Sequence, residues 1–516
     1  MLFATVITFE FAFFRASLPH RLLMGKPFFT LEDFKIAFSL FCCVYGVGTL
    51  SMPKNYATAG FVWATLALVF MGLVNMYSMV CVSKLFLLVP KSVRTFADLG
   101  EFSMGKVGRI LILITQMLVC ILLPIVFLVL GGSISVILFP NSYGQVTWII
   151  LMGLSLLPVC LIPTLKEGAF AAAAGSLGTL VADAIAVYLL IDKMVPQSKG
   201  ISIPKPDVGF TQVASVFGSL SLAYGATFVI PTLQREHSEP TRMIRVIVTT
   251  MSLITVFFLL VAVTGVSYVG CQVPGNLLFS ISGSPTALGF TANRGGVLLA
   301  CMAMLLHVII AFAITINPAF YILEGWILRL HKHTFVEQPE VESGFVASLT
   351  PDFEKDGEDK IVAEPNDLHD LDSKTYQQPG VYPKVAALRT VIVAVCVVIA
   401  CIWKDNLSDL LDFVGASCMS LCNMILPIAF YLKVNWRKVG LLEKIWCVVA
   451  ILVSLFLAGY ESWKNGKVLF NPPAKSSGPA PWDAVKFPYC PAGSSYQRIV
   501  YTNVSYHANF TRATAL

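Results

Sequence analysis

The sequence has 516 residues, of which 56% are hydrophobic and 13% are charged, and its mean hydropathy is +0.75. A chain this apolar excludes a water-soluble enzyme, a disordered protein and a nucleic-acid-binding protein, and indicates a polytopic membrane protein whose surroundings are the lipid bilayer. The formal net charge of +6 is modest and reflects the sidedness of the loops, so no nucleic-acid or other anionic partner is expected.

Hydrophobic stretches of about 20 residues are long enough to cross a bilayer as helices. Dividing the chain at charges and at Pro, Gly and Asn turns predicts an all-α integral membrane protein with eleven transmembrane helices over residues 34–460, preceded by a segment at 1–33. The predicted spans are 34–58, 61–83, 107–139, 146–163, 168–191, 209–233, 243–269, 294–328, 386–403, 411–432 and 441–460.

Lys and Arg are distributed unevenly between the two sides of these spans. If the N-terminus is inside, 24 fall in cytoplasmic segments and 12 on the other side, of which 6 are in the long C-terminal tail. Because positive charge is retained on the cytoplasmic side, we expect a cytoplasmic N-terminus and an exoplasmic tail at 461–516. The sequence leaves open whether the membrane is the plasma membrane or a vacuolar or endosomal one.

The predicted exoplasmic side carries two kinds of modification signal. Asn503 and Asn509 lie in N-x-Ser/Thr sequons of the tail, which predicts a glycoprotein. Cys271 and Cys490 are also on this oxidising side, where they can form a disulfide, and two free thiols are the alternative.

An acidic segment interrupts the apolar pattern between the eighth and ninth spans. Residues 336–378 contain twelve Asp and Glu against three Lys, which predicts a disordered cytoplasmic loop over 331–385. Binding of cytoplasmic regulators and a simple solvated linker are the two alternatives for this loop.

Two of the spans are interrupted by small residues at matching positions. Gly46 and Gly48 lie in the middle of the first span, where each glycine costs about 1 kcal/mol of helix stability and frees backbone groups that lipid cannot satisfy. Ala223, Tyr224 and Gly225 interrupt the sixth span. Such paired breaks indicate the substrate site of a transporter built from inverted repeats, although close helix packing also uses small residues.

The break in the first span has a chemical consequence. Unpaired N–H groups near Gly48 and Thr49 can hold a carboxylate, whereas the carbonyls from Val44 to Gly46, next to Val47, can accept from an ammonium group. A zwitterion satisfies both sets at once. The expected substrate is therefore an α-amino acid, bound without a full side-chain charge.

Four motifs resemble one known family, the amino acid/auxin permeases of the APC superfamily. They are GVGTLSMPKNYATAG in the first span, GSLSLAYGATFVIPTLQREHSEP in the sixth, HVIIAFAITINPAFYILE in the eighth and FVGASCMSLCNMILPIAFYL in the tenth. The resemblance covers most of residues 34–460. It implies a LeuT-like five-plus-five inverted repeat with discontinuous helices 1 and 6, in which residues 34–191 and 209–432 are the repeats and residues 441–460 are an added helix.

The same resemblance implies secondary active symport of amino acids by alternating access, coupled to protons or, in some branches, to sodium. Asp183 in the fifth span is the first candidate for the protonated group, because a carboxylate at that depth must face a cavity or be neutral. His307 is a candidate proton relay, and Thr315 is a candidate sodium ligand. Structural roles for Asp183 and His307 are the alternatives, and no other cofactor or metal is expected.

Gln116 in the third span and Tyr224 in the sixth are the side chains expected to border the substrate, against the alternatives of an interhelical hydrogen bond and aromatic packing. Glu324, at the cytoplasmic end of the eighth span, is expected to be structural. No H-E-x-x-H motif or intramembrane metal cluster is present in the sequence, so an enzyme is not expected. An amino acid sensor with little transport is the remaining alternative.

Overall fold

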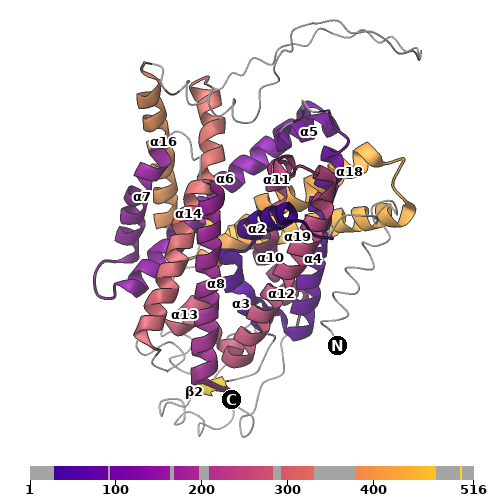
Figure 1. Cartoon of the computed structure of the whole chain (residues 1–516). Coiled ribbons are helices and arrows are strands. Elements are labelled where there is room, and N and C mark those ends of the chain that lie inside the picture. Colours follow the sequence, from indigo (N-terminus) through magenta and orange to yellow (C-terminus); the bar gives the residue numbers. More distant parts are fainter. Residues whose placement is uncertain are drawn as a thin grey trace, which may run out of the picture.

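The computed structural model describes residues 28–90, 93, 95–162, 168–196, 208–282, 292–330, 376, 379–471, 495 and 500–502. Most of the predicted acidic loop, Cys490, Asn503 and Asn509 lie outside these residues. The described part of the chain is almost entirely helical (Figure 1).

The helices follow the predicted spans closely. The first five spans correspond to α2 (Leu31–Val44) with η2 (Val47–Ser51) and α3 (Met52–Ala59), α4 (Phe61–Phe86), α6 (Lys106–Leu138), α7 (Gln145–Leu161) and α8 (Gly168–Lys193). The remaining six correspond to α9 (Phe210–Ala214) with α10 (Val216–Tyr224), η3 (Thr227–Val229) and α11 (Ile230–Glu236), then α12 (Met243–Val269), α14 (Arg294–Ile327), α16 (Val381–Ile402), α17 (Leu407–Val414) with α18 (Leu426–Asn435), and α19 (Leu441–Phe470).

Among the described residues, nine helical segments are long and apolar enough to cross a membrane, or ten if the bent pair of α2 and α3 is one span. The helix α7 is apolar but has only 17 residues. The all-helical membrane architecture is therefore confirmed, whereas the count of eleven spans is not.

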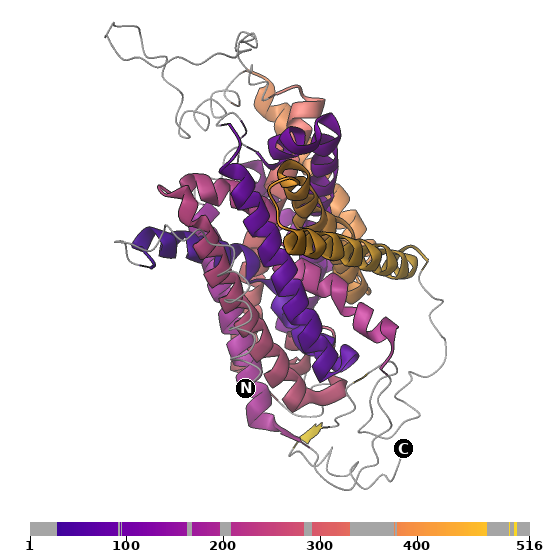
Figure 2. The ribbon, with the colours of Figure 1, turned by 90° about the vertical axis from the view of Figure 1, so that its right-hand side faces the viewer.

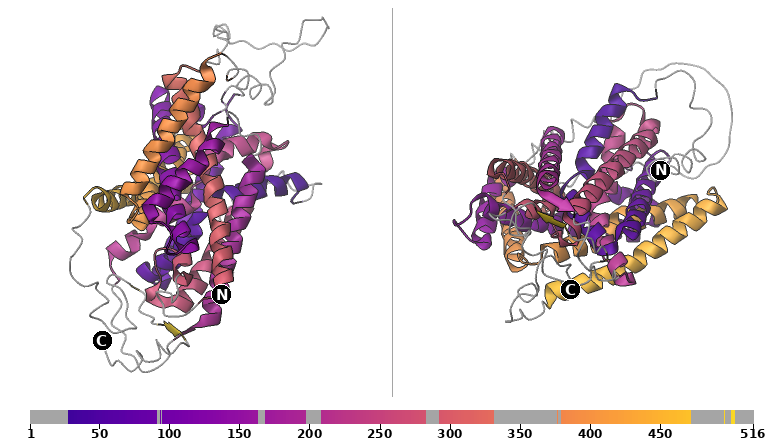
Figure 3. Two further views of the ribbon diagram at one scale, coloured as in Figure 1. Left: turned by 90° about the vertical axis from the view of Figure 1, so that its left-hand side faces the viewer. Right: turned by 90° about the horizontal axis from the view of Figure 1, so that it is seen from below.

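The helix α14 packs most extensively against α8 and α6. These three helices run side by side in Figures 1 and 3. On the other side of the molecule, α12 packs against α2, α3 and α4. The helix α19, drawn in gold in Figure 2, crosses α4 at a steep angle. Both interrupted helices lie between these groups, where each interruption is covered by protein and not by lipid.

Two short helices, α5 (Phe96–Met104) and α13 (Leu277–Ile281), were not expected from the sequence. The helix α5 lies before α6 and packs against it. Thr95 and Asp98 form a capping box, since each side chain accepts the backbone N–H of the other residue, at 3.1 and 2.9 Å. The T-x-x-D pattern is a sequence signal for this helix start.

The C-terminal tail returns to the helix ends. Strand β2 (Val500–Thr502) pairs antiparallel with β1 (Met194–Pro196), which follows α8, and the N–H of Ser495 donates to the carbonyls of Ala57 and Thr58 at 3.1 and 3.2 Å. Ser495 and Val500–Thr502 therefore lie at the face where α3 and α8 end (Figure 1). In the predicted topology this face is exoplasmic, which stays a prediction.

Cys271, in the turn η5 (Gly270–Gln272) after α12, is disulfide-bonded. Eleven other cysteines are free thiols. Because the expected partner Cys490 lies outside the described residues, the pairing of these two cysteines stays a prediction.

Candidate functional site

The first interrupted helix bends by 50° between α2 and the segment that begins at Val47. The helix α2 ends at Tyr45, whose N–H donates to the carbonyl of Phe41, and Gly46 follows in an extended conformation. Beyond it, the N–H of Thr49 donates back to the carbonyl of Gly46 at 3.1 Å. The first N–H groups of a helix have no intrahelical acceptor, so those of Val47 and Gly48 are the open donors. The sequence predicted the N–H groups near Gly48 and Thr49 as carboxylate donors. Because the N–H of Thr49 already has an acceptor, the N–H groups of Val47 and Gly48 are the better candidates.

The second interruption separates α10 from η3 and is closed by an asparagine of the tenth span. The hydroxyl of Thr227 donates to the carbonyl of Asn423 at 2.7 Å, and the N–H of Phe228 donates to Asn423 Oδ1 at 3.4 Å. Asn423 is fully buried in the π-helical segment Leu421–Ile425. Sequence reasoning missed this residue, although an amide inside an apolar span is itself a signal of function or helix contact.

The two interruptions touch each other. A Cβ atom placed on Gly48 would lie 2.5 Å from Cβ of Ala223, and one on Gly225 would lie 2.5 Å from Cε of Met419. Such distances leave no space for any side chain. The absence of a side chain at Gly48 is therefore required for the first and sixth helices to meet, whereas Gly225 lies against Met419 of the tenth span.

A cavity of about 170 Å³ lies beside both interruptions. Its walls come from α2, α6, α8, α14 and the broken sixth helix. The lining residues are Cys42, Cys43, Val44, Gly46, Val47, Gly48, Cys120, Leu123, Phe127, Gly175, Leu222, Ala223, Gly225, Phe228, Val229, His307, Ile310, Ala311, Ile314, Thr315, Pro318 and Met419. Eight of the expected site residues line this cavity, namely Val44, Gly46, Val47, Gly48, Ala223, Gly225, His307 and Thr315.

Three expected substrate contacts do not line the cavity. Tyr224 is buried between helices, and its hydroxyl donates to Oγ1 of Thr255 at 3.2 Å. Thr49 turns its hydroxyl back to the carbonyl of Gly46. Gln116 lies one turn before Cys120 on α6, and Cys120 occupies the lining position in its place.

Asp183 lies behind the first interruption and not in the cavity wall. Its side chain is 3% exposed, and Oδ2 accepts a hydrogen bond of 2.9 Å from the hydroxyl of Tyr45. Within the described part of the chain, Oδ1 has no hydrogen-bond partner. A carboxyl this deeply buried, with no charged partner at either oxygen among the described residues, is costly to ionise. Its position therefore favours a proton-binding group.

His307 stands between two glycines of neighbouring helices. A Cβ atom on Gly46 would lie 3.0 Å from its Nε2, and one on Gly175 would lie 3.3 Å from its Nδ1. Thr315 lies two turns further along α14 and faces the same cavity. The imidazole is therefore held against the backbone at the first interruption.

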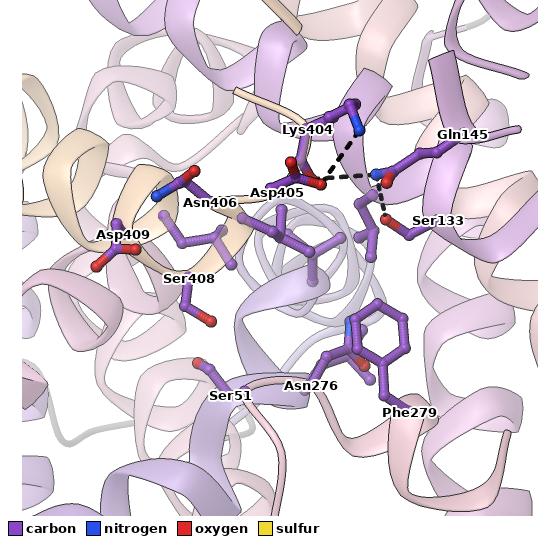
Figure 4. A pocket seen from close by; sticks show the side chains of 16 residues that line it. Ser51, Ser133, Gln145, Asn276, Phe279, Lys404, Asp405, Asn406, Ser408 and Asp409 are labelled. Atoms are coloured by element: carbon purple, nitrogen blue, oxygen red, sulfur yellow. Dashed lines mark hydrogen bonds and ion pairs between the residues drawn. The ribbon is translucent and has the colours of Figure 1, made fainter. Parts of the chain in front are cut away.

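A second, larger cavity of about 390 Å³ lies beyond the contact between the interruptions (Figure 4). Lys404 and Asp405 form an ion pair of 3.3 Å at its wall, and Gln145 donates to Ser133 Oγ at 2.9 Å. Val47 lines both cavities. The sequence did not indicate this cavity. In the predicted topology, the loops that line it are on the exoplasmic side, and we call it the outer cavity.

The opposite end of α2 is held by a buried polar cluster. Oδ2 of Asp33 accepts from Nη2 of Arg242 at 2.6 Å, and Oδ1 lies 2.8 Å from Nε2 of His237. The N–H of Glu239 donates to Nδ1 of His237 at 3.0 Å, so Nε2 carries the proton that reaches Asp33. This cluster ties α2 to the turn between α11 and α12.

Glu324 has the structural role expected for it. Its carboxylate accepts from Nε of Arg389 and from the hydroxyl of Tyr376, both at 2.7 Å. Nη1 of Arg389 also donates to the carbonyls of Cys160 and Ile162 at the end of α7. The ion pair therefore joins α14, α16 and the end of α7.

Comparisons with known proteins agree with this geometry. The family model described as "Transmembrane amino acid transporter protein" matches residues 33–465. The Arabidopsis thaliana protein "Amino acid transporter AVT1I" is 22% identical over 304 residues, which are 57% of this chain and 71% of that protein. "Amino acid transporter AVT1J" from the same plant is 24% identical over 250 residues, 46% of this chain and 57% of that protein.

Solved structures show the same fold at low sequence identity. A variant of the Eremococcus coleocola manganese transporter superposes with a TM-score of 0.53 at 14% identity, over 90% of this chain and 92% of that one. The fold is therefore LeuT-like, as the resemblance to the amino acid/auxin permeases implies. The family match over most of the chain and the cavity at both interruptions lead to one conclusion: this chain belongs to the family of transmembrane amino acid transporter proteins.

Proposed function

We propose that this protein is a secondary active transporter that symports an amino acid with a proton by alternating access. The observation that carries the proposal is the meeting of both interrupted helices at one cavity, bordered by Gly46, Gly48 and Gly225. Helix interruptions at matching positions of two repeats are the usual place of a transporter's substrate site.

The substrate's charged groups have matching partners on α2 and η2. The N–H groups of Val47 and Gly48 begin a helix and favour a carboxylate, whereas the last carbonyls of α2, up to Tyr45, favour an ammonium group. Both sets belong to consecutive residues of one interruption. A zwitterion can therefore bind there without a charged side chain of the protein.

Alternating access requires the cavity to open toward one side at a time. Gly48 and Ala223 meet at the inner cavity, and Val47 lines both the inner and the outer cavity. We propose that these residues form the gate between the two. If Gly48 and Ala223 move apart while the cytoplasmic side closes around α2, the same substrate site becomes accessible from the outer cavity. The outer cavity is the proposed entry from the exoplasmic side, and the proposed orientation has the N-terminus in the cytoplasm and the tail on the exoplasmic side.

The proton is proposed to bind Asp183, with His307 as a relay at the cavity wall. Asp183 reaches the first interruption through Tyr45, so neutralisation of the carboxyl can change how α2 ends as substrate binds. Sodium is the second candidate ion, because Thr315 faces the cavity beside the carbonyls of α2.

Uptake of labelled amino acids into proteoliposomes tests the proposal. We expect accumulation that depends on an imposed proton gradient and is unaffected by replacing sodium with potassium. Stimulation by sodium alone would favour the second candidate ion. Substrate binding without flux would instead indicate a sensor.

A further inference from the structure

Away from the interruptions, the wall of the inner cavity is uncharged and mostly apolar. The character of this wall determines which substrate side chains can bind. Among the described residues that line it, none is Asp, Glu, Lys or Arg. The substrate's carboxylate and ammonium groups are directed to the backbone of α2 and η2. The remaining wall, made by α6, α14 and the start of the inner half of helix 6, is left to contact the side chain.

This remaining wall is apolar and narrow. It includes Leu123 and Phe127 from α6, Ile310 and Ile314 from α14, and Phe228 from η3. The whole cavity measures about 170 Å³, which is below the range of about 300–1,000 Å³ that is typical of drug-sized ligand sites. A zwitterionic head group already uses part of this volume.

From this wall, and resting on the proposed function, we infer that the transporter selects amino acids with small to medium-sized, uncharged aliphatic side chains. A charged side chain would have to leave water without a partner at this wall, which is strongly unfavourable. The large aromatic side chains are disfavoured by the total volume of about 170 Å³, part of which the head group fills.

The two titratable groups nearest the cavity do not alter this selection. Asp183 does not line the cavity and already accepts from Tyr45, so it is not placed to meet a cationic side chain. His307 is pressed between the backbones at Gly46 and Gly175. Its Nε2 faces Gly46, at the end of the cavity that would hold the head group.

Two measurements on the full-length protein test the selection. In proteoliposomes, we expect alanine, valine and leucine to compete with each other for uptake, and lysine, arginine, aspartate and glutamate to compete at least 100-fold more weakly. In detergent, the neutral amino acids should raise the unfolding temperature at concentrations where the charged ones do not.

Variants of the wall give the size limit. Phe127→Ala removes a ring from the cavity, and we expect the uptake of phenylalanine relative to alanine to rise about 10-fold or more, since one methylene in an apolar pocket already changes discrimination by about 10–200-fold. Ala311→Leu adds bulk and should lower leucine uptake more than alanine uptake. Leu118→Ala is the matched control, because Leu118 is on α6 but is 45% exposed and outside the cavity.

The outcomes separate this inference from the proposed function. Wild-type transport of lysine or glutamate as efficient as that of alanine would overturn the selection and leave amino acid transport intact. Equal substrate preference in Phe127→Ala, Ala311→Leu and the control would show that this wall does not meet the side chain. Absence of uptake and of stabilisation by any amino acid would overturn the proposed function itself.

Discussion

The hydroxyl of Tyr45 donates a hydrogen bond of 2.9 Å to the carboxyl of Asp183, 138 positions later in the chain. Tyr45 is the residue at which α2 ends, and Asp183 lies within α8. In the proposed mechanism, this hydrogen bond connects the protonation of a buried carboxyl with the backbone that would bind the substrate's ammonium group.

Asp183→Asn tests this link. The amide has nearly the shape of the protonated acid and its oxygen can still accept from Tyr45, so we expect an inserted, folded protein. Accumulation driven by an acid-outside gradient should be lost, while exchange of substrate between the two sides should continue. Counterflow and gradient-driven uptake measured on the same proteoliposomes distinguish the two activities.

Thr315→Ala tests the alternative ion. If wild-type uptake is insensitive to the proton gradient but rises with external sodium, and this variant removes the rise, the proton model is wrong. With proton coupling, the variant should keep its response to the gradient. The comparison requires only one change of the ion on the outside of the vesicles.

Gly48→Val should abolish substrate binding. Its Cβ would lie 2.5 Å from that of Ala223, so the first and sixth helices would be forced apart at the site. Gly459→Val is the matched control, because nothing lies within 4 Å of a Cβ at that position of α19. Normal saturable uptake by the Gly48 variant would remove the basis for the site.

Asp33→Ala should be strongly destabilising. It leaves Arg242, which is 5% exposed, without its carboxylate, and breaking a buried ion pair in this way costs about 3–5 kcal/mol. We expect a lower unfolding temperature in detergent and reduced transport. Glu32→Ala is the control on the same turn, since the Glu32 side chain is 37% exposed and bonds the backbone N–H of Ser238; an equal loss in both variants would refute a special role for the buried pair.

Cys271 and Cys490 should appear in one peptide pair when the non-reduced protein is analysed by mass spectrometry. Cys271 is disulfide-bonded and cannot pair with any of the eleven free thiols. Glycosidase treatment should also shift the mobility of the protein made in a eukaryotic host. A tail that proteases reach only from the cytoplasmic side would contradict the proposed sidedness.

The features that could be predicted from the sequence are those that depend on residues close together in the chain. Apolar length placed the helices, and glycines in the middle of a span located both interruptions. A buried acid at the depth of Asp183 had to be close to a partner or a cavity, and Tyr45 is that partner.

The remaining parts depend on how helices rotate and meet. Gln116 and Cys120 are four positions apart on α6, and only the packing of α6 against α14 decides which one borders the cavity. The orientation of Tyr224 is also decided by packing, because its hydroxyl donates to Thr255 of α12 and so points away from the cavity. The ion pair of Asp33 with Arg242 joins residues that are 209 positions apart, and no local pattern connects them.

The attachment of the tail also sets an order for biosynthesis. Strand β2 and Ser495 are translated long after β1 and the end of α3, to which they bond. The early helices must therefore remain in the bilayer without these contacts until residues 495–502 have been made. A prematurely terminated chain would expose these ends to the quality-control machinery, which could then reject it before it reaches its destination membrane.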